Sequence, residues 1–299
     1  MNAAAGKWNI PLLLIHTLFF LLSLSMIVPL ILIVMISITD EQALLADGFR
    51  LIPEKFSLMA YKLVLESPKM LLNAYGVTIF VTTVGTILSL LVVSSAAYAL
   101  SRRTYRLRKP TLVYFVITML FNGGLIPSYI LITQYLHLKN TIWVLIVPAL
   151  ASVWNIMIMR TYMLSLPQEI VESAYMDGAG EWRIYAVIIL PLSMPSVATL
   201  GLLTAFGYWN EWFAGLLYID NDHQNLVPLQ LLLYRIETMA NYIGSNLGDA
   251  ARTLVDESRF PAYGTRFAMA VLATGPMLFI FPFFQKYFVK GLTIGSLKG

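Results

Sequence analysis

Six apolar runs, each long enough to cross a lipid bilayer, constrain the fold of this chain more than any other feature. A spanning helix needs about 20 predominantly apolar residues. Only 12% of the 299 residues are charged, against about 25% in a water-soluble domain. The runs are Leu12–Ile36, Gly76–Leu100, Thr111–Thr133, Thr141–Arg160, Ser196–Ile219 and Phe267–Phe288. We therefore predict an all-α membrane protein with six transmembrane helices.

The runs predict a single transmembrane domain over residues 1–299. Its parts are an N-terminal span at 12–36, five core spans within 76–288, a polar hairpin at 168–190 and external loops at 37–75 and 220–266. The first run follows Lys7, as the apolar part of a signal peptide would. Because it is too long for such a segment and lacks a small-residue cleavage site, we predict that it is retained as a span.

One short loop sets the predicted orientation. The segment Ser101–Pro110 contains five Lys or Arg residues and no acidic residue. Positively charged loops stay on the cytoplasmic side of a membrane. Alternation of the six spans then places both termini and the loop Thr161–Met194 in the cytoplasm. The same rule explains the net charge of +4, so we expect no nucleic-acid partner.

The cytoplasmic loop Thr161–Met194 is acidic, which is unusual on this side of a membrane. Its acidic residues outnumber the single Arg183; they are Glu169, Glu172, Asp177 and Glu181. Gln168–Met176 can form a short helix, and Asp177 followed by Gly178 is a turn signal. A second helix over Glu181–Leu190 would end at the prolines that follow. We interpret this hairpin as a docking surface for another subunit.

The hairpin resembles the EAA signature of permease subunits of bacterial ABC importers. The segments Glu172–Ala174, Asp177–Gly180 and Ile188–Pro191 follow its pattern, E-A-A-x-x-x-G and then I-x-L-P, with Ser173 in place of an alanine. The resemblance implies the type I importer permease fold and contact between this hairpin and a separate ATPase. The residues implied in ATPase coupling are Glu169, Glu172, Ser173, Ala174, Asp177, Gly178, Ala179, Gly180, Leu190 and Pro191. The alternative is an interfacial amphipathic hairpin without a partner, although such hairpins favour Lys and Arg on their polar face.

Three further segments are similar to carbohydrate importer permeases, in particular the maltose-type second permease and its oligosaccharide branch. They are Asn122–Ser128, Trp209–Trp212 and Gly291–Gly299. This resemblance implies import of oligosaccharides through the bacterial cytoplasmic membrane, by one half of a heterodimeric pore. The implied partners are a second homologous permease, two ATP-binding subunits and an extracytoplasmic solute-binding protein. An importer of amino acids or metal ions is the alternative within the same class.

The charge of the sugar is left open by the sequence. Four basic residues in the predicted external loop are compatible with an acidic oligosaccharide or with a solvated surface. These residues are Arg235, Arg252, Arg259 and Arg266.

Polar and aromatic residues near one end of the fifth run are candidates for the substrate path. They are Tyr208, Trp209, Asn210 and Glu211, to which we add Asn122 in the third run. Glu211 is the one carboxylate in a predicted span, and facing lipid it would cost roughly 2.5–3.5 kcal/mol. Rings that stack on sugars and groups that bind hydroxyls suit a carbohydrate path, whereas the alternative is an ordinary interfacial aromatic belt. For Asn122-Gly123-Gly124 we expect close helix packing rather than local unwinding.

The predicted external loop Asp220–Arg266 is too long for a simple turn. We expect it to dock the solute-binding protein, with Asn241–Asp249 important for that contact, and we expect Leu226–Leu233 to be a short surface helix. A solvated cap over the outer helix ends is the alternative. The C-terminal Lys298–Gly299 is a further candidate for contact with the ATPase.

Several classes of function are excluded by what the sequence lacks. It has no G-x-x-x-x-G-K-[ST] loop, so ATP must be bound by another polypeptide and no cofactor is expected here. It has no cysteine and three widely separated histidines, so no metal site or catalytic constellation is predicted and the chain is not an enzyme. An ion-coupled secondary transporter would need more ionisable groups within its spans. A membrane scaffold would not need the Gly corner of the hairpin.

Overall fold

The computed structural model describes residues 10–66, 68–246, 261 and 263–278, with side chains described only as far as residue 239 in the second range. The regular elements among the described residues are helices, and the one strand-like pairing there is an isolated antiparallel bridge between Thr39 and Phe56. This confirms the all-α prediction. The chain divides into two compact units, one formed by Met1–Pro68 with Ile236–Thr274 and the other by Lys69–Arg235 with Gly275–Gly299.

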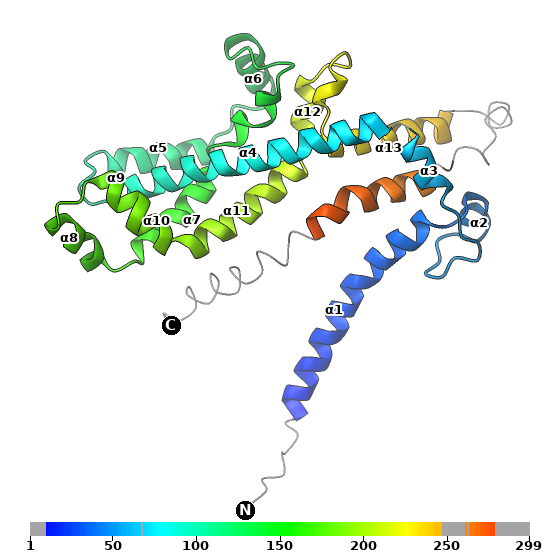
Figure 1. Cartoon of the computed structure of the whole chain (residues 1–299), viewed down its shortest axis with the longest axis horizontal. Coiled ribbons are helices and arrows are strands. Elements are labelled where there is room, and N and C mark those ends of the chain that lie inside the picture. Colours follow the sequence, from blue (N-terminus) through cyan, green and yellow to red (C-terminus); the bar gives the residue numbers. More distant parts are fainter. Residues whose placement is uncertain (1–9, 67, 247–260, 262, 279–299) are drawn as a thin grey trace, which may run out of the picture. The chain divides into compact units, whose positions relative to one another are not determined.

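The first unit contains one long exposed helix and several short ones. They are α1 (Ile10–Ser37), α2 (Glu41–Asp47), α3 (Met59–Leu65), the part of α13 (Leu229–Asn246) from Ile236 onward, and most of a helix over 263–278 (Figure 1). Apolar side chains of α1 remain exposed along most of its length, for example Phe20 at 66% and Met26 at 73%. An exposed apolar helix of this length is stable in a lipid environment.

A buried carboxylate joins two distant segments of the first unit. Glu41 opens α2 and is 8% exposed. Its two oxygens accept the backbone N–H groups of Tyr263 (2.9 Å) and Gly264 (3.0 Å). The first N–H groups of a helix have no partner within the helix, and a carboxylate at this end also interacts favourably with the helix dipole. Glu41 therefore caps the helix over 263–278.

The second unit consists of long helices interrupted by short irregular turns. Its elements are α4 (Pro68–Ser101), α5 (Arg108–Leu120), α6 (Leu125–Ile130), the π-helix η1 (Leu131–Tyr135), the 3₁₀-helices η2 (Ile142–Leu145) and η3 (Val147–Ala149), α7 (Val153–Leu164), α8 (Gln168–Met176), α9 (Glu181–Arg183), the π-helix η4 (Ile184–Ile189), α10 (Leu190–Leu192), α11 (Met194–Trp209), α12 (Phe213–Tyr218), the 3₁₀-helix η5 (Gln224–Leu226) and the first residues of α13 (Leu229–Asn246). Figure 1 shows α4 running alongside α11, with α5 and α7 next to one half of α4.

The helix α4 contributes to both hydrophobic clusters of the second unit. Its C-terminal half packs with α7, α8, η4 and α11, through residues such as Ala97 and Ile184. Its N-terminal half packs with η1, η2, α11 and α12, through residues such as Val81 and Tyr208. Both clusters therefore depend on the position of α4.

A stripe of buried small and hydroxyl residues lets neighbouring helices approach α4 closely. A carbon added at Gly85 would lie 2.7–2.9 Å from ring atoms of Tyr208 on α11. The buried hydroxyls also bind other segments: Thr78 Oγ1 accepts the Leu229 N–H (2.8 Å), and Ser89 donates to the Leu150 carbonyl (3.0 Å). Small residues at helix contacts and hydroxyls that bind across helices are typical of membrane proteins.

The predicted spans are only partly confirmed. By length and composition, two helices among the described residues can cross a membrane, and up to five spans result if each bent pair of helices counts as one. The two are Pro11–Ser37 and Pro68–Ser101, which match the first two predicted runs. The prediction of six spans stays a prediction, and the end of its last span, 279–288, lies outside the described residues.

Three predicted spans are broken rather than continuous. The third bends by 113° between Leu120 and Leu125, and the fourth bends by 48° between Ala149 and Val153. The helix of the fifth ends at Trp209 instead of continuing to Ile219, and it pairs instead with the preceding segment Glu181–Leu192 at a bend of 78°. Hydropathy is insensitive to such breaks, because the residues on both sides remain apolar.

The predicted external loops are largely helical. The segment 37–75 contains α2, α3 and the first turns of α4, and 220–266 contains all of α13 and the start of the helix over 263–278. Leu226–Leu233 is not a surface helix, because Leu229 and Leu231 are fully buried. Most of Asn241–Asp249 has no described side chain or lies outside the described residues, as do Arg252 and Arg259.

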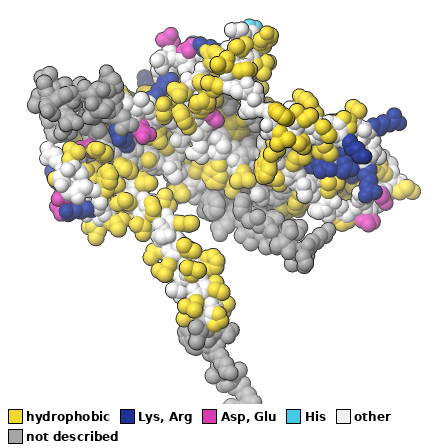
Figure 2. Space-filling model, turned by 180° about the vertical axis from the view of Figure 1, so that it is seen from behind, with side chains coloured by type: hydrophobic (Ala, Val, Ile, Leu, Met, Phe, Trp, Pro, Cys, Tyr) yellow, Lys and Arg dark blue, Asp and Glu magenta, His cyan; other side chains and the backbone are white. Residues whose placement is uncertain are grey.

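Apolar side chains cover much of the visible surface, and basic ones gather at one end of the second unit, beside α5 (Figure 2). The basic group belongs to the segment 102–109, where Arg103, Arg106 and Lys109 are exposed. This segment joins the end of the span α4 to α5. An apolar surface next to a short basic segment is typical of the cytoplasmic boundary of a membrane protein.

The close contact at Gly85 generates a prediction about stability. Gly85→Ala should lower the free energy of unfolding by about 1–3 kcal/mol, because the buried Tyr208 ring cannot move away without losing the hydrogen bond from its hydroxyl to the Ile146 carbonyl. Gly76→Ala is the control in the same helix, since a carbon added there meets nothing within 4 Å. Thermal unfolding of both variants in detergent would measure the difference. Equal stability of the two variants would contradict the packing argument.

Candidate functional site

A break between two helices positions Glu211. The helix α11 ends at Trp209 and α12 begins at Phe213. The sequence predicted that Glu211 lies inside a continuous span. In the structure it lies between two helices instead. Its Oε1 accepts the Ala214 N–H (2.8 Å), which supplies a partner for one of the free N–H groups at the start of α12. This contact accounts for a carboxylate at this position independently of any ligand.

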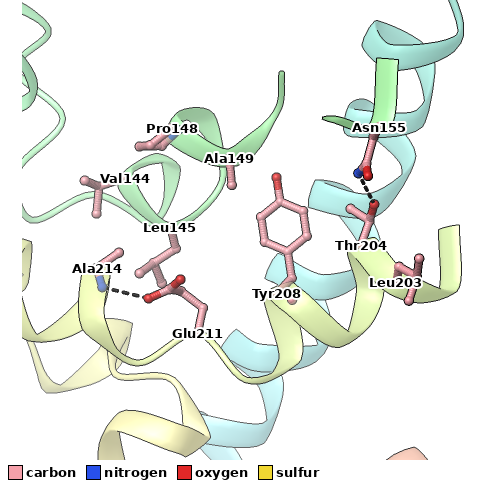
Figure 3. A pocket seen from close by; sticks show the side chains of 11 residues that line it. Val144, Leu145, Pro148, Ala149, Asn155, Leu203, Thr204, Tyr208, Glu211 and Ala214 are labelled. Atoms are coloured by element: carbon pink, nitrogen blue, oxygen red, sulfur yellow. Dashed lines mark hydrogen bonds between the residues drawn. The ribbon is translucent and has the colours of Figure 1, made fainter. Parts of the chain in front are cut away.

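A cleft of about 380 Å³ lies next to Glu211. Figure 3 shows the Glu211 carboxylate turned toward the Ala214 N–H and, farther along the cleft, the side chains of Asn155 and Thr204 close together. Asn155 donates a hydrogen bond of 3.4 Å to the Thr204 hydroxyl. Asn155 is held at the start of α7, where its own N–H is bonded by the Ser152 side chain (3.3 Å) that caps this helix.

A second cleft, of about 350 Å³, brings together two residues predicted for the substrate path. It is lined by Asn122 and Glu211, together with Ser128 on α6 and Tyr218 on α12. The helices α6 and α12 lie side by side (Figure 1), and the rings of Tyr129 and Tyr218 stack with centroids 5.6 Å apart. Glu211 and Ala214 line both clefts, and Glu211 is the charged residue of this shared pair.

The segment Asn122-Gly123-Gly124 unwinds the chain rather than packing against another helix. Asn122 Oδ1 accepts the Gly124 N–H (2.8 Å), and Gly124 has φ +87°, a conformation that favours glycine. A carbon added at Gly124 would meet nothing within 4 Å, so close packing within this chain does not explain it. No such helix contact is present among the described residues of this chain, and the unwound segment places Asn122 at the second cleft.

The remaining predicted residues of the substrate path are engaged within the chain or lie outside the clefts. Tyr208 lines the first cleft with its ring but donates its hydroxyl to the Ile146 carbonyl (3.0 Å). Trp209 is buried at 4% exposure. Asn210 is exposed, and its amide donates to the Phe206 carbonyl (2.9 Å). Of the predicted polar residues, Glu211 and Asn122 line the clefts, whereas Asn210 lines neither of them.

Sequence reasoning missed three polar residues of the clefts, Asn155, Thr204 and Ser128. Their only signal was a polar residue within an apolar run, which is too common to single out a site. Among the described residues that line the clefts, polar groups are amides, hydroxyls and one carboxylate, and none is Lys, Arg or His. Such a lining is suited to neutral, hydroxyl-rich molecules. The described part of the chain contains no cluster of His, Asp and Glu able to hold a metal ion.

The hairpin at 168–190 has the form predicted for its first half. The helix α8 covers Gln168–Met176, and Gly178 adopts φ +75° in the turn that follows. The second helix begins at Glu181 as predicted, but it continues through Pro191 to Leu192 with a π-helical segment, and the chain bends at Ser193.

The residues implied in ATPase coupling are partly exposed and partly buried in the structure. Those left exposed are Glu169, Glu172, Ser173, Asp177, Gly178, Gly180 and Pro191. Ala174 is 6% exposed and packs in the cluster around Ala97 and Tyr185, against which Ala179 and Leu190 are also placed. These three small or apolar residues thus pack the hairpin against its own chain. Their role in contact with a partner stays a prediction.

Glu181 connects the hairpin to α4, a contact that the sequence did not predict. Its two carboxylate oxygens accept hydrogen bonds from the hydroxyls of Tyr98 on α4 and Tyr175 on α8. The Arg102 guanidinium lies 4.4 Å from the centre of the Tyr98 ring. Burial, followed by the hydrogen bond to Glu181, raises the pKa of the Tyr175 hydroxyl.

A polar cluster joins two segments near α12 that are distant in the sequence. Asn140 and Asp220 exchange hydrogen bonds, from the Asn140 amide to the carboxylate (2.9 Å) and from the Asp220 N–H to the Asn140 side chain (2.8 Å). Lys139 lies 3.0 Å from the same carboxylate. The hydrogen bond from Asn140, and then that from Lys139, lower the pKa of Asp220. These contacts fix the link between η1 and η2 to the end of α12.

Comparison with known families agrees with this arrangement. Residues 106–294 match the family described as "Binding-protein-dependent transport system inner membrane component". The chain belongs to this family. It is therefore a permease, the membrane subunit of an ABC importer and not an enzyme, as predicted. Membership also confirms the prediction of a multi-pass protein of the inner membrane. The secondary-transporter and scaffold alternatives therefore no longer apply.

Named relatives are similar to the permease over almost its whole length. "Protein LplC" of Bacillus subtilis (strain 168) is 38% identical over 273 residues, 91% of this chain and 90% of that protein. "Polygalacturonan/rhamnogalacturonan transport system permease protein YtcP" of the same organism is 33% identical over 287 residues, 96% of this chain and 98% of that protein.

A solved structure shares the fold. It is described as a "bacterial ABC transporter involved in the import of the acidic polysaccharide alginate", and one of its chains is 27% identical to the permease. The two superpose with a TM-score of 0.78, covering 96% of the permease and 100% of that chain. This likeness supports the type I importer permease fold.

Two substitutions separate the roles of Glu211 as hydrogen-bond acceptor and as charge. Glu211→Gln retains an acceptor for the Ala214 N–H, whereas Glu211→Leu removes it. We expect the glutamine variant to unfold at the parent temperature and the leucine variant to lose about 1 kcal/mol, the usual cost of removing a helix cap. Thermal unfolding in detergent measures both. If the two variants are equally destabilised, the charge rather than the cap stabilises this break.

The lowered pKa of Asp220 gives a prediction with a defined sign. Because the folded pKa lies below the unfolded value of about 3.9, the carboxylate stabilises the folded form above that pH and loses this effect as the pH falls through the lowered value. Asp220→Asn mimics the protonated form. At neutral pH, hydrogen exchange should therefore become faster at Asn140, whose N–H binds the Tyr218 carbonyl (3.0 Å). Asp222→Asn, two residues farther along, should leave the exchange unchanged.

Proposed function

We propose that this permease imports oligosaccharides derived from acidic polysaccharides, as one half of a heterodimeric pore in the bacterial cytoplasmic membrane. The observation that carries the proposal is similarity over nearly the entire chain to two proteins whose names specify such substrates. One name refers to polygalacturonan and rhamnogalacturonan and the other description to alginate. Importers of amino acids or metal ions are the second possibility within the family.

The geometry of the clefts supports a hydroxyl-rich substrate. The amide of Asn155 and the hydroxyl of Thr204 lie along one cleft, and Asn122 and Ser128 lie along the other. Each of these groups can donate to and accept from sugar hydroxyls. The acidic groups of the substrate would find no Lys or Arg among the described lining residues, so we expect their charge to be met by the second permease or the binding protein.

The partners are proposed on the basis of family membership and the exposed hairpin. A binding-protein-dependent system requires an external binding protein and a source of energy, and this chain has no nucleotide-binding loop. We assign ATP to two ATP-binding subunits that contact α8 and its turn through Glu169, Glu172 and Asp177. We also propose that both termini and the hairpin are cytoplasmic, on the same side as the basic segment 102–109.

Two further contacts follow from this orientation as proposals. The segment Asp220–Arg266 would face the binding protein on the external side, where Arg235 and Arg266 supply positive charge. The tail that ends in Lys298–Gly299 would face the ATPase pair, and it lies outside the described residues.

Co-purification tests the proposed assembly. Affinity purification of the permease from mild detergent should recover a second permease and an ATP-binding subunit. Glu172→Arg should remove the ATP-binding subunit and leave the second permease bound, because Glu172 is exposed on the hairpin. Glu66→Arg, at an exposed carboxylate after α3, is the control. Retention of the ATP-binding subunit by Glu172→Arg would contradict the proposed docking surface.

The substrate class is tested with the purified complex in proteoliposomes. The binding protein loaded with oligogalacturonate should stimulate ATP hydrolysis, whereas a neutral glucose oligomer of equal length should not. Equal stimulation by both would retain the oligosaccharide proposal and remove the acidic class. Stimulation only by amino acids or metal ions would overturn the sugar proposal.

A further inference from the structure

The carboxylate of Glu181 is the meeting point of three elements of the second unit. Glu181 begins α9, Tyr175 belongs to α8, and Tyr98 lies near the end of α4. Each tyrosine hydroxyl donates to a different oxygen of the carboxylate. Hydrogen bonds to a charged acceptor are stronger than those between neutral groups. One side chain thus links both halves of the hairpin to a spanning helix.

A second layer of contacts lies deeper between the same elements. Ser94 on α4 and Tyr185 on η4 share a hydrogen bond of 2.7 Å, and the rings of Tyr98 and Tyr185 lie 5.2 Å apart. Tyr185 and Ile184 are buried in the cluster that includes Ala174. This inner layer already attaches the hairpin to the body of the unit. The outer contact at Glu181 adds orientation, because it fixes α8 and α9 to a single point on α4.

From Tyr98 the path continues along α4 to the substrate cleft. The helix α4 is continuous from Pro68 to Ser101, so its two ends move together. On its other half, Gly85 contacts the ring of Tyr208, which lines the cleft beside Glu211. A displacement of the hairpin that turns or shifts α4 must therefore be accommodated at Tyr208.

We propose that Glu181 is a positioning residue that fastens the coupling hairpin to α4, so that movement imposed on α8 by ATP-driven closure reaches the substrate cleft. This inference rests on the proposed function of the hairpin as the ATPase contact. The two proposals concern different residues. Glu181 binds Tyr98 on α4 and Tyr175, whereas Glu172 belongs to the proposed ATPase surface.

The proposal is tested by the number of sugar molecules transported per ATP hydrolysed in the reconstituted complex. Glu181→Ala should lower this ratio by about tenfold, the effect of losing a hydrogen bond to a charged group, while the ATP-binding subunit stays bound. Glu181→Gln should largely restore the ratio, because an amide can bond to both hydroxyls. Tyr175→Phe, which removes one donor, should give an intermediate ratio.

Control variants separate this effect from a general loss of structure. Glu66→Gln and Tyr135→Phe change an exposed carboxylate and an exposed tyrosine elsewhere, and both should retain the parent ratio. A role limited to stability would lower the yield of folded complex and leave the ratio of transport to hydrolysis unchanged.

A covalent link provides an independent test. A crevice of about 450 Å³ between α4 and α9 is lined by Ser95 and Trp182, and Trp182 is 77% exposed. The chain has no native cysteine, so a cysteine pair at these two positions can be linked selectively by a short bismaleimide. In the Glu181→Ala background, this link should restore transport per ATP, because it replaces the lost attachment of the hairpin to α4.

The outcomes distinguish this proposal from the function on which it rests. A low ratio in Glu181→Ala that is restored by the cross-link supports the attachment role. A parent ratio in Glu181→Ala, or a low ratio that persists after cross-linking, overturns it. If Glu172→Arg still binds the ATPase, the docking proposal fails irrespective of the result at Glu181.

Discussion

The close approach of other helices to α4 is the constraint on which the second unit depends. In a bilayer, helices gain little from burying apolar surface against each other, so they associate through packing and hydrogen bonds. On α4 these contacts come from one stripe, in which Gly85 admits the Tyr208 ring and Thr78, Ser89 and Ser94 bind other segments. A bulkier residue in this stripe would separate α4 from α11. The two hydrophobic clusters that contain residues of both helices would then lose contacts.

The breaks between helices explain why polar residues line the clefts. Within a membrane, irregular backbone is tolerated only where its polar groups find partners or face a water-filled space. Asn122 accepts the Gly124 N–H and Glu211 accepts the Ala214 N–H, each at the start of a helix. The same side chains line open space. The structural and the ligand-binding interpretations of Glu211 are therefore compatible. One of its two carboxylate oxygens accepts the Ala214 N–H, and the side chain also lines the cleft.

Local patterns were sufficient to predict the parts of the structure that local physics determines. Gln168–Met176 and the turn at Gly178 were predicted from a turn signal and a short polar run, and the spans α1 and α4 from length and hydropathy. The breaks at Phe121–Gly124 and Asn210–Trp212 were not, because apolar residues continue on both sides. The burial of Ala174 and the contacts of Glu181 were not predicted either, because both depend on α4. Tyr98 on α4, for example, is 83 residues away from Glu181 in the sequence.

The cap formed by Glu41 sets a condition on the order in which this protein matures. Its partners, the N–H groups of Tyr263 and Gly264, are 222 and 223 residues farther along the chain. At a synthesis rate of roughly 5–20 residues per second, Glu41 must wait about 10 to 45 s after its own synthesis for them to be made. Until then its carboxylate has to remain hydrated, or shielded by the insertion machinery. The first unit is therefore completed only after Tyr263 and Gly264 have been synthesised.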